Sequence, residues 1–318
     1  MALLRAPGAE IHAEVKTLTS FADQLAACAG LVETRLQDAL QAESQRGTPD
    51  RLVSAMRHGV LGGGKRFRPF LLINSASLFN VPAHEALTAA AAIECIHCYS
   101  LIHDDLPAMD NDEMRRGRPT VWKAFDEWTA ILAGDGLQAL AFELLSAPQV
   151  NGDATVRAAL VHTLAVASGS PGMVGGQALD LEAGITTNSA NADANHITRL
   201  QAMKTGRLIR AACEMGAILG HANARDRAAL QAYGDALGVA FQISDDLLDA
   251  EGHASTVGKA TGKDEAAGKA TLVSLLGVAD ARVRLEETVA LAIDALAPFG
   301  PAANVLRDAA RFMGRRGS

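Results

Sequence analysis

The sequence predicts an all-α protein, and three features carry that prediction. Alanine and leucine, which favour helix, dominate every long segment. Aromatic residues, which favour sheet, make up only 4% of the chain. Apolar residues recur at i, i+3, i+4 and i+7 between breaks, and no stretch alternates with period two for long enough to predict a strand. Because no Pro/Ser-rich linker divides the 318 residues, we expect a single domain, residues 1–318.

The helical segments follow one another between clusters of glycine, proline and polar residues. The helical spacing begins with Ile11, Val15 and Leu18, continues through Leu31, Leu36 and Leu40, and returns at Leu132, Leu137, Leu140 and Leu144. Breaks are expected at Gly62–Gly64, Pro82, Pro107, Gly117–Pro119, Pro148–Asp153, Ser170–Pro171, Thr186–Asn195 and Gly258–Lys269. Residues 1–9 and 314–318 are expected to be loosely held.

Composition excludes several classes of protein. With 29 basic and 36 acidic residues the net charge is −7, whereas proteins that bind nucleic acid generally present a basic surface. The first 15 residues lack the apolar run of a signal peptide, and no later stretch reaches 18 residues without a charge, so we expect neither secretion nor a membrane span. Four cysteines are too few for a disulfide framework, which favours a reducing, cytoplasmic location.

A repeated acidic pattern ends two apolar helical runs. Residues 102–106 and 243–247 share the sequence I-x-D-D-L. Asp245 and Asp249 are four residues apart, about 40° around one helix, so both can bind a common ion. Their apolar surroundings make uncompensated charge costly, and a divalent metal is the natural compensation.

The first acidic cluster needs a break in its helix before it can act as one site. Asp104 and Asp110 are six residues apart, about 240° around an ideal helix, and Pro107 between them supplies a distortion. Carboxylate oxygens suit Mg²⁺ or Mn²⁺. An EF-hand is excluded, because Met114 and Arg115 occupy positions that its loop reserves for a ligand and a glycine.

Basic residues gather near these acids and are candidate phosphate ligands. His97 lies seven residues before Asp104, on nearly the same helix face. Acidic and basic clusters together predict a site in which metal and cationic side chains hold a diphosphate. The basic groups are Lys65, Arg66 and Arg68, then Arg115 and Arg116, then Lys204, Arg207 and Arg210.

Two motifs would indicate other functions, a nucleotide-binding P-loop and a zinc or redox site, and both are rejected. Residues 59–65 fit G-x-x-x-x-G-K, but Arg66 stands where a P-loop needs Ser or Thr, and the preceding segment predicts helix rather than strand. Cys95 and Cys98 form C-x-x-C, but no second ligand pair and no βαβ context accompany them. We interpret both cysteines as core residues.

Six ordered motifs between about residues 50 and 275 resemble those of trans-prenyl diphosphate synthases, most closely the bacterial farnesyl (geranyl) diphosphate synthases. The resemblance implies a single-domain helical bundle around a deep central cavity, the isoprenoid synthase fold, acting as a homodimer. The motifs are GGKRFRP at 63–69, HxxxLIHDDLPxMD at 97–110, RRGxPT at 115–120, GGQxxD at 175–180, KTG at 204–206 and FQxxDDxxD at 241–249.

The same resemblance implies a reaction and a role for each matching residue. Isopentenyl diphosphate would condense with dimethylallyl or geranyl diphosphate, giving farnesyl diphosphate. About three Mg²⁺ ions would be held per site, with Mn²⁺ as an alternative. The metal ligands would be Asp104, Asp105, Asp110, Asp245 and Asp249; the allylic diphosphate would be bound by Arg115, Lys204 and Lys259; isopentenyl diphosphate by Lys65, Arg68, His97 and Arg116. Thr205 and Gln242 would stabilise the allylic cation, and residues 258–269 would close as a lid.

Chain length and rival functions complete the expectations. Tyr99 lies five residues before Asp104, about 7.5 Å along the helix. The resemblance implies that an aromatic residue at this position ends the growing hydrocarbon at C15; geranyl and geranylgeranyl products are the alternatives. A terpene cyclase has no need of the second diphosphate site formed by Lys65, Arg68 and His97. A non-catalytic subunit of a heteromeric synthase could lose its carboxylates, and none is missing here.

Overall fold

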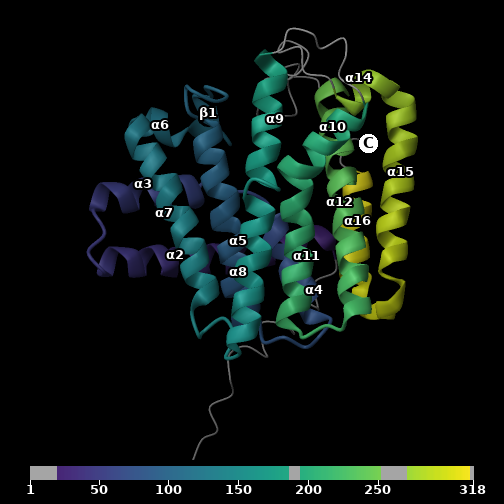
Figure 1. The fold of residues 1–318 in the computed structure, drawn as a ribbon, viewed down its shortest axis with the longest axis horizontal. Coiled ribbons are helices and arrows are strands. Elements are labelled where there is room, and N and C mark those ends of the chain that lie inside the picture. The colour runs from purple at the N-terminus through teal and green to yellow at the C-terminus, as the bar shows by residue number, and fades with distance from the viewer. Residues whose placement is uncertain (1–19, 186–193, 252–270, 316–318) are drawn as a thin grey trace, which may run out of the picture. The chain divides into compact units, whose positions relative to one another are not determined.

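The computed structural model describes residues 20–185, 194–251 and 271–315, and within them helix predominates, as predicted (Figure 1). The exception is a short ribbon, β1 (Met114–Arg115) paired with β2 (Arg118–Pro119), which the sequence did not predict because each strand has only two residues. The expected breaks at Gly62–Gly64, Pro82 and Pro107 all lie between helices. Residues 1–9, the break after residue 185 up to residue 193 and the expected lid, 258–269, lie outside the described residues.

The chain divides into two compact units, here called unit 1 and unit 2. Unit 1 comprises the described residues up to Met114, Arg118–Val161 and Met215–Ala222; unit 2 comprises Arg115–Gly117, His162–Glu214 and Asn223 onward. Two of the boundaries fall within helices, α8 (Ala154–Ser168) and α11 (Arg207–Leu219), and two fall within the β1–β2 ribbon. The other helices of unit 1 are α2 (Phe21–Gln45), α3 (Asp50–Val60), α4 (Phe67–Ser77), α5 (Ala83–Asp104), α6 (Val121–Ala124) and α7 (Glu127–Ser146).

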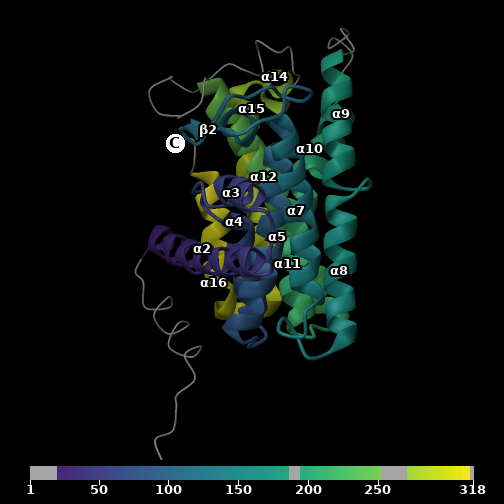
Figure 2. The ribbon, with the colours of Figure 1, turned by 90° about the vertical axis from the view of Figure 1, so that its left-hand side faces the viewer.

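Helix α5 is the core of unit 1. Residues 89–93 are fully buried, as are Cys95, Ile96 and Cys98, because apolar residues cover most of the circumference of this helix. It packs against α2, α3, α4 and α7, and α5 and α7 run side by side (Figure 2). Glu85–Asp104 has the length and composition of a membrane span, yet 72% of its apolar window is buried in the protein, as in the core helix of a globular unit.

Helix α2 covers this core with one face. Ser20 caps its N-terminus by accepting a hydrogen bond from the Asp23 amide at 3.1 Å. Its buried residues, Leu25, Cys28, Val32, Leu36, Ala39 and Leu40, follow the predicted three-and-four spacing. In α7 that spacing holds for Leu137, Leu140 and Leu144, whereas Leu132 is 46% exposed.

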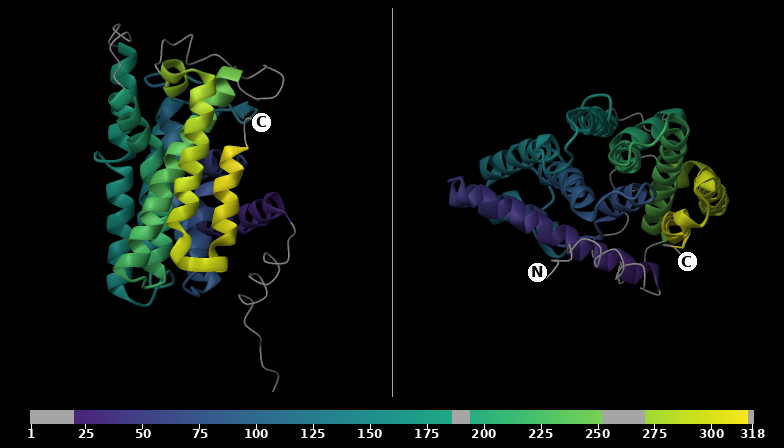
Figure 3. Two further views of the ribbon diagram at one scale, coloured as in Figure 1. Left: turned by 90° about the vertical axis from the view of Figure 1, so that its right-hand side faces the viewer. Right: turned by 90° about the horizontal axis from the view of Figure 1, so that it is seen from below.

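Unit 2 is built around the long helix α12. This helix contacts α14, α15 and α16, which Figure 3 shows beside it. The buried Tyr233 on α12 donates a hydrogen bond to the Leu306 carbonyl on α16 at 2.7 Å, which satisfies its hydroxyl. Helix α15 and the segment Ala297–Gly314 that follows it are together long and apolar enough for a membrane span, but the chain bends by 92° between them. The elements are α9 (Met173–Ile185), α10 (Ala194–Gln201), η2 (Ala202–Gly206), α12 (Ala224–Glu251), α14 (Leu272–Leu276), α15 (Val278–Ala295), η3 (Ala297–Ala303) and α16 (Asn304–Gly314).

Candidate active site

The first acidic cluster is formed by a turn that follows α5. The helix ends at Asp104, and the backbone then turns back, so that the Asp110 amide donates to the Asp104 carbonyl at 2.8 Å. Asp104 is half-buried and Asp110 exposed, while Asp105 is 3% exposed. The predicted distortion around Pro107 is confirmed, and it brings the backbones of two candidate metal ligands together.

The segment beyond this turn is held by side chains from α6 and its N-cap. The Asp112 carbonyl accepts hydrogen bonds from Thr120 Oγ1 at 2.8 Å and from Trp122 Nε1 at 2.9 Å. The Thr120 amide also donates to the Glu113 carbonyl at 3.0 Å. The acidic turn is therefore fixed at both ends, by α5 before it and by α6 after it. Within the ribbon that follows, Arg115 is half-buried and Arg116 exposed.

The end of α5 is also fixed by α7. His103, directly before Asp104, lies with Nε2 3.0 Å from the Ile131 carbonyl. Its ring fills the space above Gly134, where a Cβ would be 2.1 Å from that nitrogen. Glycine at position 134 therefore permits the close approach of the two helices beside the acidic turn.

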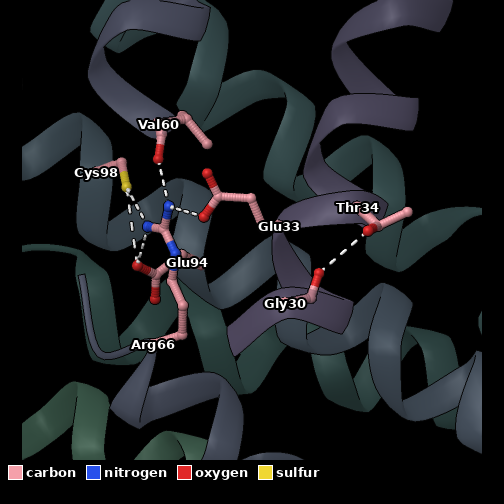
Figure 4. Close-up of polar contacts among 7 residues, drawn as sticks. All are labelled: Gly30, Glu33, Thr34, Val60, Arg66, Glu94 and Cys98. Atoms are coloured by element: carbon pink, nitrogen blue, oxygen red, sulfur yellow. Dashed lines mark hydrogen bonds and ion pairs between the residues drawn. The ribbon is translucent and has the colours of Figure 1, made fainter. Parts of the chain in front are cut away.

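The basic group at residues 65–68 is divided by the fold. Lys65 is exposed and Arg68 half-buried, both next to the N-terminus of α4, where backbone amides and the helix dipole favour an anion. Arg66 was predicted to belong to the same phosphate-binding group, and this is wrong: its side chain is fully buried in ion pairs with Glu94 and Glu33 (Figure 4). Sequence reveals the charge of Arg66 but not the direction of its side chain.

The second acidic cluster lies on one helix, as predicted. Asp245 and Asp249 are half-buried residues of α12. Asp246 between them is buried and accepts a hydrogen bond from Gln201 Nε2 at 3.0 Å. The pattern of burial separates one structural carboxylate from two that remain partly accessible for a metal. Sequence reasoning did not find Gln201.

Lys204 and Thr205 lie in a single π-helical turn, η2. Such turns contain an extra residue and occur often at functional sites. Lys204 Nζ donates to Asp180 Oδ2 on α9 at 2.6 Å. Glycines permit the close packing on both sides: a Cβ at Gly176 would lie 2.2 Å from the Lys204 nitrogen, and one at Gly238 would lie 2.8 Å from the Cα of Gly206. The packing around η2 was not predicted from these two glycines, although they are a signal that could have indicated it.

A cavity of about 260 Å³ in unit 2 is lined by Gln242 together with Arg207, Arg210 and Asp235. Burial raises the pKa of Asp235 above its usual value, against the lowering effect of the two arginines. Lys204 was predicted to form one basic group with these arginines. Its ammonium pairs with Asp180, and the arginines line the cavity beside Asp235.

The donor set of both acidic clusters suits Mg²⁺. All five predicted ligands offer carboxylate oxygens, which hard divalent cations prefer. In the described parts of the chain, no three acidic, histidine or cysteine side chains approach closely enough to hold a metal by themselves. Mg²⁺ commonly takes its remaining oxygen ligands from substrate and water. The predicted ligand Lys259 lies outside the described residues.

The cysteine pair is part of the core, as interpreted. Cys95 and Cys98 are each 0% exposed and belong to α5. Burial raises the pKa of the Cys95 thiol, so it remains protonated and unreactive at neutral pH. The P-loop remains excluded, since residues 50–60 form helix α3 rather than a strand.

Comparison with known proteins identifies the family. Residues 49–294 match the polyprenyl synthetase family. The chain is 43% identical over 273 residues to the farnesyl diphosphate synthase of Escherichia coli (strain K12), covering 85% of this chain and 89% of that protein. An FPP/GFPP synthase structure from Zymomonas mobilis is 45% identical with a TM-score of 0.82, covering 95% of this chain and 99% of that one.

A geranyltransferase structure from Legionella pneumophila also has a TM-score of 0.82, at 33% identity, covering 96% of this chain and 98% of that one. The sequence motifs, the helical structure and the similarity to these proteins all indicate the same family, and each extends over most of the sequence. The predicted isoprenoid synthase fold is confirmed, and the chain belongs to the polyprenyl synthetase family of prenyltransferases.

Proposed function

We propose that this chain is a farnesyl diphosphate synthase, which joins isopentenyl diphosphate to dimethylallyl diphosphate and then to geranyl diphosphate. In each cycle the allylic C–O bond breaks, a C–C bond forms, and diphosphate and one proton leave. The observation that carries the proposal is the pair of acidic clusters, each at the end of an apolar helix and each with two partly accessible carboxylates. Family membership supports it.

Divalent metal, Mg²⁺ or Mn²⁺, would be bound by Asp104, Asp105 and Asp110 in unit 1 and by Asp245 and Asp249 in unit 2. When bound, the metal stabilises the negative charge that develops on the leaving diphosphate. The burial of Asp105 favours Asp104 and Asp110 as the direct ligands of their cluster.

The cationic side chains bind the two diphosphates. Arg115, Lys204 and Lys259 hold the allylic one, and Lys65, Arg68, His97 and Arg116 hold that of isopentenyl diphosphate. The hydrogen bond from the Lys204 ammonium to Asp180 supports this role, because it orders the ammonium before a diphosphate binds. The oxygens of Thr205 and Gln242 orient toward the developing allylic cation. The reaction needs no side-chain nucleophile, and the departed diphosphate can accept the proton.

Assembly and location follow from the surface and the composition. We propose a homodimer, because Trp128, Ile131 and Leu132 expose 57%, 44% and 46% of their surfaces on α7. Sedimentation of the purified chain tests the dimer. We place the protein in the cytoplasm, where its buried thiols remain reduced.

Product identity tests the proposed function directly. The purified chain, incubated with Mg²⁺, dimethylallyl diphosphate and excess isopentenyl diphosphate, should give a C15 product by mass spectrometry. A C10, C20 or C25 product would keep the reaction and change the chain length; the FPP/GFPP synthase relative makes the longer product worth quantifying. No product from any allylic diphosphate of C5 to C15 would refute catalysis and favour the non-catalytic subunit.

A further inference from the structure

Arg66 occupies an unusual backbone position in a tight loop of unit 1. Its φ is 49°, in the left-handed region that residues with side chains rarely adopt, and it is the N-cap of α4. Gly63 and Gly64 just before it also have positive φ, at 83° and 126°. A strained residue persists only where its surroundings hold it, and such residues cluster at functional sites.

The guanidinium of Arg66 provides that hold (Figure 4). Nη1 donates to Glu94 Oε1 on α5 at 2.7 Å. Nη2 donates to Glu33 Oε2 on α2 at 3.0 Å and to the carbonyl of Val60, the last residue of α3, at 2.6 Å. One side chain therefore joins the start of α4 to three other helices.

Burial makes this arrangement difficult to leave. The side chains of Arg66 and Glu94 are 0% and 2% exposed, and that of Glu33 is 30% exposed. Burial is the largest single effect and lowers the pKa of Arg66, but the charges of Glu94 and Cys98 and the hydrogen bonds to Glu94 and Glu33 together outweigh it and raise the pKa, so the guanidinium stays charged. Separating a buried cation from both carboxylates would leave unpaired charges inside the protein, which is strongly unfavourable.

We propose that Arg66 is a positioning residue for the isopentenyl diphosphate subsite, an inference that rests on the proposed function of Lys65, Arg68 and His97. Lys65 directly precedes Arg66, and Arg68 follows it in the first turn of α4. His97 lies one helical turn after Glu94 on α5. The buried ion pair thus fixes the two segments that carry the three diphosphate ligands, and preorganised cations bind an anion without the cost of ordering them.

The test separates positioning from stability by comparing the two substrates. Arg66→Met removes the hydrogen bonds of the guanidinium, and Glu94→Gln removes the charge of its most buried partner. In both variants we expect KM for isopentenyl diphosphate to rise by about tenfold or more, while KM for geranyl diphosphate stays within about twofold. Calorimetric titration with isopentenyl diphosphate should show the same loss.

Control variants separate a loss of stability from a loss of isopentenyl diphosphate binding. Val32→Ala, a buried change on α2 next to Glu33, should lower the melting temperature without changing either KM. If Arg66→Met does not fold, Arg66→Lys and Glu33→Gln serve instead, since lysine keeps the charge but lacks the planar fork that spans several acceptors. An unchanged KM for isopentenyl diphosphate, or an equal rise for both substrates, in a folded variant overturns the proposal.

Variants of the proposed diphosphate ligands Lys65 and Arg68 show whether a negative result refutes only the role of Arg66 or the proposed subsite itself. Lys65→Ala and Arg68→Ala should raise KM for isopentenyl diphosphate whatever the role of Arg66. If they do so and the Arg66 variants do not, only the positioning role is wrong. If Lys65→Ala and Arg68→Ala also leave that KM unchanged, the subsite itself is misassigned.

Discussion

The backbone amide of Asp110 donates a hydrogen bond to the carbonyl of Asp104 at 2.8 Å, although the two residues are six positions apart in the sequence. Two further hydrogen bonds close the same turn, from the Asn111 amide to the Leu106 carbonyl at 3.0 Å and from the Asp112 amide to the Asp105 carbonyl at 3.1 Å. A continuous helix would have placed Asp104 and Asp110 on different faces. The turn makes their backbones neighbours and forms one of the two candidate acidic clusters.

Removing one carboxylate charge from this turn should affect turnover more than folding. We expect Asp104→Asn, at saturating Mg²⁺, to lower kcat by about 10²- to 10³-fold, since several kcal/mol of transition-state stabilisation correspond to that factor at about 1.4 kcal/mol per decade. Steady-state kinetics with geranyl diphosphate measure the loss, and circular dichroism checks the fold.

The matched control for this prediction is Asp38→Asn, an exposed carboxylate on α2 that should leave kcat unchanged. Asp245→Asn should resemble Asp104→Asn, because it changes the other acidic cluster. If Asp104→Asn or Asp245→Asn keeps more than half of the wild-type rate, the carboxylate that was replaced does not hold catalytic metal.

Sequence patterns predicted the parts of the site that depend on local geometry. The helical spacing of Asp245 and Asp249, the break at Pro107 and the burial of Cys95 all follow from residue type and periodicity within one segment. Even there, Asp246 carries the same charge as its neighbours but is hydrogen-bonded to Gln201, a contact across 45 residues. Local pattern does not distinguish a structural acid from a catalytic one.

The features that escaped prediction depend on which segments meet. Arg66 was grouped with Lys65 because adjacent charges look alike in a sequence, and only the packing of α2 and α5 against the loop gives it buried partners. The Lys204 to Asp180 ion pair joins residues 24 apart. The π-helical turn escapes because one extra residue does not visibly disturb an apolar period of 3.6.

Asp153 allows a test of pH-dependent stability. Its carboxylate accepts a hydrogen bond from the Thr155 amide at 2.8 Å at the start of α8, and this bond lowers the pKa of Asp153 below its usual value. A lowered pKa in the folded state means that the carboxylate stabilises the fold above the unfolded pKa of about 3.9, and that this contribution is lost as pH falls through the folded pKa. We expect Asp153→Ala to lower the melting temperature at pH 7, with a difference that shrinks below pH of about 4.

The control is Asp153→Asn, which keeps an acceptor oxygen but cannot titrate. It should retain most of the melting temperature at pH 7 and show a weaker dependence on pH than the wild type. A difference between Asp153→Ala and wild type that is constant from neutral to acid pH would contradict the role of the ionised carboxylate.

The four cysteines should be inert in the folded protein. All are buried, and burial, with a contribution from the charge of Glu94, raises the pKa of Cys28 to about 12. A thiol reagent at pH 8 should therefore react only after denaturation, because the thiolate is the reactive form. Cys95→Ala/Cys98→Ala should keep its activity under reducing conditions. Zinc found by elemental analysis, or activity that follows the redox state of this pair, would contradict a packing role.

Tyr99, which the sequence predicts to end the product chain, is a buried residue of α5. It is 5% exposed on α5, and its ring meets that of His103 edge-on, with centroids 5.7 Å apart. Burial raises the pKa of its phenol, and the charge of Asp104 adds to this effect, so the hydroxyl stays neutral. A buried, neutral aromatic ring is consistent with the predicted role of Tyr99 as the end of the product cavity.

Replacing Tyr99 with alanine should remove this floor. We expect Tyr99→Ala, supplied with excess isopentenyl diphosphate, to shift the product from C15 toward C20, because the lost ring leaves space for another isoprene unit while the acidic clusters are unchanged. The chain contains one other tyrosine, Tyr233, which is buried in unit 2 and hydrogen-bonded to α16. Tyr233→Phe should lower stability and leave product length at C15. Mass spectrometry of the products decides: an active, folded Tyr99→Ala variant that still stops at C15 would show that another residue limits the chain.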